Sequence, residues 1–164
     1  MPLPRTNRVG VVGLGVSGLA TARYLLAQGI SPLLFDTRTP PASWAAAADL
    51  HACPHHFGPL DSALLARCEL LVVGPGLALA EPALQAAAVA GVEIIGDIEL
   101  FARTVTVPVI AITGSNGKST VTTLVGEMAQ AAGVKVAIGG NLGTPALALL
   151  DASVELYVLE LSSF

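Results

Sequence analysis

Short runs of apolar, often β-branched residues alternate along the chain with longer stretches in which apolar residues recur every three or four positions. The longer stretches have the period of helices that pack one face on a core. The short runs predict β-strands, at residues 8–12, 30–35, 69–73, 92–95, 109–112, 134–138 and 155–161. Strands that alternate with helices in this way are typical of doubly wound α/β proteins with parallel sheets.

The alternation also predicts two domains. In the first, a strand, a glycine loop, a helix and a second strand form the start of a Rossmann-like sheet. Residues 104–108 are the expected boundary, because a new apolar strand with its own glycine loop begins at Val109. We therefore expect a Rossmann-like parallel-sheet domain over 1–103 and the start of a P-loop-type α/β domain, incomplete in this chain, over 104–164.

Several local predictions concern packing and capping. The run 109–112 is expected to be a buried strand that is covered on both faces. The helix over 118–132 is expected to turn one apolar stripe toward the core, namely Val121, Leu124, Val125, Met128 and Ala132. Ser43 is expected to cap an Ala-rich helix that ends at residue 50, and Asp61 and Thr144 are expected to cap the helices that follow them.

A glycine loop with a lysine follows the strand that opens the second domain, in the sequence T-G-S-N-G-K-S-T. Gly114 and Gly117 permit backbone angles that turn consecutive N–H groups around an anion. Lys118 supplies a charge for outer phosphates, and Ser119 or Thr120 supplies a hydroxyl for Mg²⁺. The standard pattern, G-x-x-x-x-G-K-[ST], has its first glycine two positions earlier. The alternative is an ordinary strand–helix turn with a surface lysine, and we favour the phosphate site.

The first domain carries another glycine motif, G-L-G-V-S-G, between its first strand and first helix. Asp36 ends the next strand, at the spacing at which a dinucleotide-binding protein holds a ribose hydroxyl. Thr37 and Arg38 follow it, and this trio could equally hold a base or a different sugar. A lone G-x-G-x-x-G is weak evidence for any one ligand, because its third glycine, Gly18, also serves tight packing of helix on strand.

An acidic residue near the end of the last predicted strand is the candidate metal ligand. Glu160 stands there among leucine and valine residues, where an unpaired carboxylate is costly. A strand-end carboxylate beside a phosphate loop is placed to coordinate Mg²⁺, directly or through water. The alternative is an ordinary strand-end acid.

Composition and charge narrow the classes of partner and location. The formal net charge of -4 gives no reason to expect a nucleic-acid or membrane-surface partner. No apolar run reaches the roughly 18 residues that a membrane span needs, and the early glycines argue against a signal peptide. Cys53 and Cys68 lack a C-x-x-C spacing and fit buried thiols of a reducing compartment. We therefore expect a cytoplasmic protein without membrane insertion.

The run H-A-C-P-H-H at residues 51–56 invites a metal interpretation. Zinc sites usually pair two such ligand clusters, and the sequence offers only this one. We expect an edge strand or a surface loop at this position instead.

The two glycine motifs and the segments around them resemble the Mur ligase family of peptidoglycan synthesis, over nearly the whole chain. The segments that carry the resemblance are G-L-G-V-S-G (13–18), D-T-R (36–38), G-P-G (74–76), G-D-I-E-L-F (96–101), T-G-S-N-G-K-S-T (113–120), G-G-N-L-G (139–143) and L-E-L-S-S-F (159–164). The T-G-S-N-G-K-S-T loop is specific to the family. The chain is most similar to the amino-terminal portion of the branch that adds D-glutamate to UDP-N-acetylmuramoyl-L-alanine.

The resemblance implies a role for each motif. The first domain would bind a UDP-sugar, with the diphosphate facing Leu14, Gly15, Val16 and Ser17, the uracil facing Asp36, Thr37 and Arg38, and the substrate cleft lined by Pro75, Gly76 and Asn141. ATP would be held by Gly114, Ser115, Asn116, Gly117, Lys118, Ser119 and Thr120. Lys118 would be the catalytic residue on the ATP phosphates, and Ser119 and Glu160 would bind Mg²⁺.

The implied reaction is ATP-dependent amide-bond formation. ATP would phosphorylate the carboxylate of the nucleotide-linked L-alanine, and the amine of D-glutamate would attack the acyl phosphate. The family has a longer central domain and a third domain, so we expect this chain to be a fragment that does not ligate alone. We also expect a monomer. The alternatives are an NAD-dependent Rossmann oxidoreductase, which leaves the Lys118 loop unexplained, and a non-catalytic nucleotide-binding module.

Overall fold

The computed structural model describes residues 8–162 of the chain. The chain divides into two compact units, Met1–Arg103 and Thr104–Phe164, at the position where the sequence predicts a domain boundary. Both units are built from helices and parallel strands. The predicted α/β fold class is therefore confirmed.

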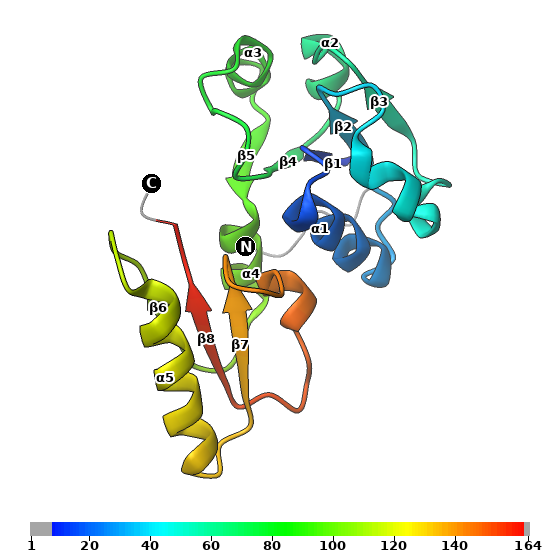
Figure 1. The fold of residues 1–164 in the computed structure, drawn as a ribbon. Helices are drawn as coiled ribbons and strands as arrows, with labels where there is room; N and C mark the ends of the chain where they lie inside the picture. The colour runs from blue at the N-terminus through cyan, green and yellow to red at the C-terminus, as the bar shows by residue number, and fades with distance from the viewer. Residues whose placement is uncertain (1–7, 163–164) are drawn as a thin grey trace. The chain divides into compact units, whose positions relative to one another are not determined.

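The first unit carries a five-stranded sheet in the order β3-β2-β1-β4-β5 (Figure 1). Its strands are β1 (Val9–Val12), β2 (Leu33–Asp36), β3 (His55–Phe57), β4 (Leu70–Val73) and β5 (Glu93–Gly96). Its helices are α1 (Val16–Ala27), α2 (Ser62–Leu65), α3 (Pro82–Val89) and α4 (Asp97–Thr104), with short 3-10 helices η1 (Ala42–Ala46) and η2 (Ala48–Leu50). The strand order reverses between β1 and β4, which in open parallel sheets is where ligands bind.

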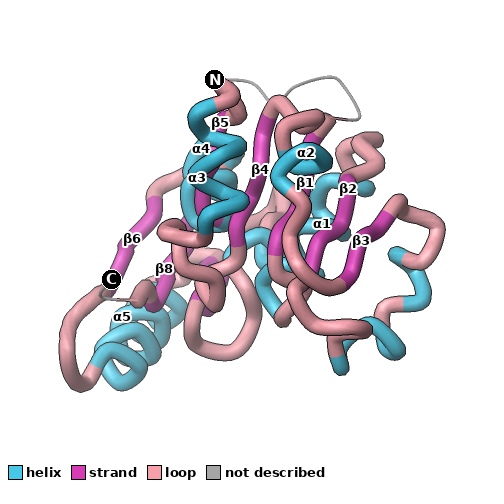
Figure 2. Tube along the Cα trace, turned by 90° about the horizontal axis from the view of Figure 1, so that it is seen from above, coloured by secondary structure: helices cyan, strands magenta, loops and turns pink. Residues whose placement is uncertain are grey.

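The central strands of this sheet are buried because helices cover both faces. Every residue of β1 and β4 is buried, as expected for the centre of a parallel sheet. α1 lies on one face, and α2 and α3 lie on the other (Figure 1). On the α2–α3 side, Val12, Phe35 and Leu71 belong to one core cluster with Leu65 and Leu84. Seen from above, the strands run side by side (Figure 2). Because all of their pairings are parallel, their carboxyl ends share one edge of the sheet.

The second unit carries a three-stranded sheet in the order β6-β8-β7. Its elements are β6 (Val109–Ile112), α5 (Lys118–Ala131), β7 (Val136–Gly140), η3 (Ala146–Leu149) and β8 (Leu156–Glu160). Among residues 104–162, the buried apolar side chains are Ala146, Leu147, Tyr157, Val158 and Leu159. The second unit therefore has a much smaller core than the first.

The strand β6 forms where the sequence predicts it, but the prediction that both of its faces are covered is wrong. Val109 and Ile110 are 38% and 40% exposed. β6 lies at the edge of its sheet and pairs with β8 alone among the described strands. The apolar run of β6 therefore keeps one side without a neighbouring strand.

The apolar stripe predicted for α5 is also wrong, because the helix packs through a different face. Leu124 and Met128 are 54% and 64% exposed, whereas Thr122 is fully buried. Gly126 is buried too, and a Cβ placed on it would meet the Ile138 side chain at 2.0 Å. The small residues of α5 thus bring its backbone against the sheet, whereas Val121, Leu124 and Met128 are exposed and Val125 is half-buried.

Two predicted helices form only as 3-10 turns, without the predicted caps. The Ala-rich segment folds into η1 and η2, and Pro41, not Ser43, precedes its first turn. Likewise Pro145, not Thr144, precedes η3. Asp61 does cap α2, as predicted.

The histidine-rich run ends in the edge strand β3, as predicted. Each histidine ring bonds to a different backbone carbonyl, His51 to Trp44, His55 to Cys53 and His56 to Pro59. No three His, Cys, Asp or Glu side chains gather into a metal site among the described residues. Both cysteines are buried free thiols, as predicted. Over residues 8–162, every helix is too short or too polar to cross a membrane.

Candidate functional site

A pocket of about 450 Å³ opens at the carboxyl edge of the first sheet. It is lined by Gly13, Gly15, Val16, Ser17, Gly18, Asp36, Thr37, Arg38, Gly74, Pro75, Gly76 and Leu77. These residues follow β1, β2 and β4, which are neighbours in the sheet. The pocket thus lies at the switch point and brings together most of the residues predicted for the UDP-sugar. Leu77 was not predicted, although it stands directly after the G-P-G segment.

The β1–α1 loop presents backbone donors to this pocket. Gly15 is the N-cap of α1 and makes no side-chain cap, and the first turn contains no acidic residue. The first N–H of α1 with a backbone partner is that of Leu19, which donates to the Gly15 carbonyl at 2.9 Å. Over residues 8–162, the N–H groups of positions 15–18 have no acceptor within the chain. A free helix N-terminus of this kind attracts an anion such as a phosphate.

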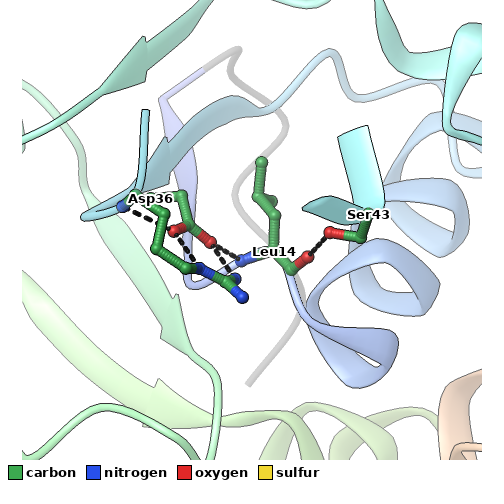
Figure 3. Close-up of polar contacts among 4 residues, drawn as sticks. Leu14, Asp36 and Ser43 are labelled. Atoms are coloured by element: carbon green, nitrogen blue, oxygen red, sulfur yellow. Dashed lines mark hydrogen bonds and ion pairs between the residues drawn. The ribbon is translucent and has the colours of Figure 1, made fainter. Parts of the chain in front are cut away.

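The carboxylate of Asp36 is saturated by internal donors (Figure 3). Oδ2 accepts from the Leu14 N–H and from Arg38 Nη2, both at 2.7 Å. Oδ1 accepts from the Arg38 N–H at 2.9 Å and from Arg38 Nε at 2.8 Å. An ionised carboxylate has about four acceptor positions. Asp36 therefore has none left for a ribose diol while Arg38 stays in place, which disfavours the dinucleotide alternative.

These contacts set the charge state of Asp36. The side chain is only 2% exposed, and burial by itself opposes ionisation. The hydrogen bonds from Arg38 and Leu14 outweigh burial and hold the pKa of the Asp36 carboxyl below its ordinary value. The ion pair therefore belongs to the folded state at neutral pH, and Asp36 joins the β1–α1 loop to Arg38 at the end of β2.

We expect Asp36→Asn to lower the unfolding free energy by about 2 kcal/mol at pH 7, because an amide cannot accept all four donors. A carboxyl with a depressed folded pKa stabilises the fold above its unfolded pKa, about 3.9, and loses this contribution as pH falls through the folded pKa. The deficit should therefore shrink below about pH 4. Urea unfolding at pH 7 and pH 3, followed by Trp44 fluorescence, measures both values.

Asp49→Asn is the matched control for Asp36→Asn. Asp49 pairs with Arg23 at 2.7 Å, but both side chains are about half exposed, so we expect a loss below about 1 kcal/mol. A stability of Asp36→Asn equal to wild type at pH 7, or a deficit unchanged at pH 3, would contradict the prediction.

Leu14 differs from its predicted role. Its side chain is fully buried, and its N–H is bound to Asp36. Leu14 does not line the pocket, and its buried side chain anchors the β1–α1 loop in the core of the first unit. Asn141 lies in the second unit, where its N–H donates to the Glu160 carbonyl at 2.9 Å.

The loop before α5 has the backbone shape of a phosphate cradle. Gly117 precedes α5 in a left-handed conformation, with φ of 73°, which favours glycine. No atom lies within 4 Å of a Cβ built on Gly114 or Gly117, so the space around both is open. The ammonium of Lys118 donates to the Gly114 carbonyl at 2.7 Å. The N–H groups of positions 115–120 have no acceptor among the described residues.

Two side chains with oxygen atoms that can bind a metal ion meet beside this loop. The Ser119 hydroxyl donates to Glu160 Oε2 at 2.6 Å, and Glu160 is 7% exposed at the end of β8. A hydroxyl and a carboxylate are hard oxygen ligands, which is the donor set that Mg²⁺ prefers. The residues present therefore fit this ion. Thr120 lines an open hollow of about 410 Å³ along the first turns of α5, together with Ser119, Thr123, Leu124 and Glu127.

Comparison with protein families gives two adjacent matches. Residues 7–96 match the model of the Mur ligase MurD-like N-terminal domain. Residues 112–164 match the model of the Mur ligase middle domain. The two matches fall in the first and the second unit, respectively.

Curated relatives are similar over almost the whole chain. The chain is 56% identical over 158 residues to the UDP-N-acetylmuramoylalanine--D-glutamate ligase of Escherichia coli (strain K12), which covers 96% of this chain and 36% of the relative. It is 57% identical over 159 residues to the ligase of the same name from Salmonella typhimurium (strain LT2), with the same coverage. The chain thus spans about a third of the length of these relatives.

Solved structures share the fold at low identity. A ligase from Neisseria meningitidis that acts on UDP-N-acetylmuramate and L-alanyl-gamma-D-glutamyl-meso-diaminopimelate aligns with a TM-score of 0.60 and 16% identity, over 95% of this chain and 54% of that one. The UDP-N-acetylmuramate-alanine ligase of Thermotoga maritima aligns with a TM-score of 0.57 and 19% identity, over 94% and 37%. Because the N-terminal domain model alone matches more than half of the residues, the chain belongs to the Mur ligase family, with a MurD-like N-terminal domain.

Proposed function

We propose that this chain supplies the sugar-nucleotide site and the first part of the ATP site of a ligase that joins D-glutamate to UDP-N-acetylmuramoyl-L-alanine. One observation carries the proposal: in each unit, a parallel strand is followed by a glycine loop and a helix N-terminus whose N–H groups have no acceptor among the described residues. The names of the curated relatives support the choice of substrates.

In the first unit, the N-terminus of α1 binds the diphosphate through the N–H groups of positions 15–17. Arg38 keeps N–H groups that Asp36 does not use, and with the exposed Thr37 hydroxyl it binds the carbonyl groups of uracil. Pro75 and Gly76 line the same pocket toward the sugar. Asn141 is assigned to the substrate on the resemblance alone.

In the second unit, Gly114, Ser115, Asn116, Gly117, Lys118, Ser119 and Thr120 hold ATP. The Lys118 ammonium offsets the negative charge that builds up as the phosphoryl group moves to the alanine carboxylate. The amine of D-glutamate then attacks the acyl phosphate, the new C–N bond forms, and phosphate leaves. Ser119 and Glu160 hold Mg²⁺, which supplies further charge stabilisation when bound.

The remaining expectations belong to the same proposal. They are a cytoplasmic location, a monomeric state, and the lack of ligase activity in the 164-residue chain by itself. We expect no ligase activity because the chain spans only 36% of the length of the relative. D-glutamate-dependent phosphate release by the purified chain would contradict this expectation.

Thermal unfolding with added ligands tests the proposal. A ligand that binds only the folded state stabilises it, by about 2.7 kcal/mol at 100 times its Kd. We expect UDP and Mg·ATP each to raise the unfolding temperature, and NAD to leave it unchanged at the same concentration. Stabilisation by NAD, with no response to UDP, would overturn the proposal in favour of the oxidoreductase.

A further inference from the structure

Both backbone polar groups of Leu14, in the β1–α1 loop, are held by side chains (Figure 3). On one side, the Leu14 N–H donates to Asp36 Oδ2 at 2.7 Å. On the other, the Ser43 hydroxyl donates to the Leu14 carbonyl. The sequence predicts Ser43 only as a helix cap, and the proposed function gives this residue no role.

The hydrogen bond from Ser43 fixes the direction of the next N–H group. The Leu14 carbonyl and the Gly15 N–H belong to one planar trans peptide, so they point in opposite directions. While Ser43 holds the carbonyl, the Gly15 N–H is turned away from Ser43, and Gly15 lines the pocket. A peptide that precedes glycine is otherwise easily rotated, because glycine restricts the backbone least.

The segment that carries Ser43 is itself fixed to the sheet. The Trp44 ring contacts the rings of His51, His55 and Phe57, with centroids 4.6, 4.8 and 5.0 Å apart. Phe57 lies in β3 and is the register partner of Asp36 in β2. Asp36, which accepts from the Leu14 N–H, and Phe57, which packs against the neighbour of Ser43, therefore lie side by side in adjacent strands.

We propose that Ser43 is a positioning residue that aims the Gly15 N–H at the diphosphate of the bound sugar nucleotide; this rests on the proposed function of the first unit. The hydroxyl bond also polarises the peptide and makes the N–H a stronger donor. Ser43 is not among the residues that line the pocket. Its effect is confined to ligands that carry phosphate.

The test compares UDP with uridine in calorimetric or NMR titrations of the 164-residue chain. In Ser43→Ala, we expect the affinity for UDP to fall about tenfold, the effect of one misaligned hydrogen bond to a charged group, and the affinity for uridine to stay within twofold. Ser43→Thr keeps the hydroxyl and should retain the UDP affinity. Ser62→Ala, which removes an exposed hydroxyl at the start of α2, is the control and should change neither affinity.

Three outcomes would overturn the proposal: unchanged UDP affinity in Ser43→Ala, an equal loss for UDP and uridine, or an equal loss in Ser62→Ala. A measurement without ligand keeps the test separate from the proposed function. The Gly15 amide signal in a ¹⁵N–¹H spectrum should shift or broaden in Ser43→Ala and stay in place in Ser43→Thr. If the chain does not bind UDP but the Gly15 signal changes in this way, the sugar-nucleotide site is refuted, and so is the role of Ser43 in phosphate binding. If the Gly15 signal does not change in Ser43→Ala, the positioning of the Gly15 N–H by Ser43 is refuted.

Discussion

Gly18→Ala should destabilise the first unit by about 3 kcal/mol or more, at the upper end of what overpacking costs. A Cβ on Gly18 would lie 1.8 Å from the Gly13 carbonyl oxygen and 2.9 Å from its carbon. Both are backbone atoms, and Gly13 is itself held by a 2.8 Å hydrogen bond from its N–H to the Phe35 carbonyl. The clash can be relieved only by moving α1 away from β1. Urea unfolding followed by Trp44 fluorescence measures the loss.

Two other glycines serve as matched controls for Gly18→Ala. Gly15 has no atom within 4 Å of an added Cβ and a φ of -74°, which alanine also adopts, so Gly15→Ala should change stability by less than about 1 kcal/mol. At Gly126, the added Cβ would meet the flexible end of the Ile138 side chain, which can move, so the cost should be intermediate. Gly18→Ala within about 1 kcal/mol of wild type would contradict the close helix–strand contact.

Lys118→Ala should weaken the binding of Mg·ATP by about ten- to a hundredfold, because hydrogen bonds to charged groups contribute about 1.5–3 kcal/mol. From residue 104 onward the chain contains only two basic side chains, Lys118 and Lys135. Only Lys118 lies on the loop, where its ammonium is within 2.7 Å of the Gly114 carbonyl. Calorimetric titration of the purified chain with Mg·ATP measures the change.

Lys135→Ala removes the same charge at the other end of the second sheet. Its backbone carbonyl accepts from the Glu155 N–H just before β7 and β8 begin, away from their carboxyl ends. We expect its affinity for Mg·ATP to stay within about threefold of wild type, because a distant exposed charge is screened by salt. Equal losses in the two variants would mean that overall charge, and not the loop, holds the nucleotide.

Local sequence was sufficient to place the pocket. Glycine motifs act through the backbone of a few adjacent residues, so their position after a strand already indicates a loop and a helix N-terminus. The parallel strand order then gathers Gly15, Asp36 and Pro75 at one edge, because the carboxyl ends of parallel strands share an edge.

Contacts between distant residues could not be predicted in this way. The bonds of Leu14 to Asp36 and to Ser43 join positions 22 and 29 residues apart, and nothing in the spacing marks Ser43 as a partner. The prediction of which face of α5 packs on the sheet was wrong for another reason. The spacing of apolar residues indicates a helix but does not decide which face is packed. The packed face carries the small residues Thr122 and Gly126, which allow the helix backbone to approach the sheet closely.

The small core of the second unit has a consequence for its backbone. With few buried apolar side chains beneath α5, local opening of this helix requires less free energy than opening of α1 or β1. The amide hydrogens of α5 should therefore exchange with solvent sooner than those of the central strands of the first unit. A phosphate group bound by the N–H groups at positions 115–120 would stabilise the N-terminus of α5 and slow the exchange of its amide hydrogens. Nucleotide binding and ordering of the helix are therefore coupled.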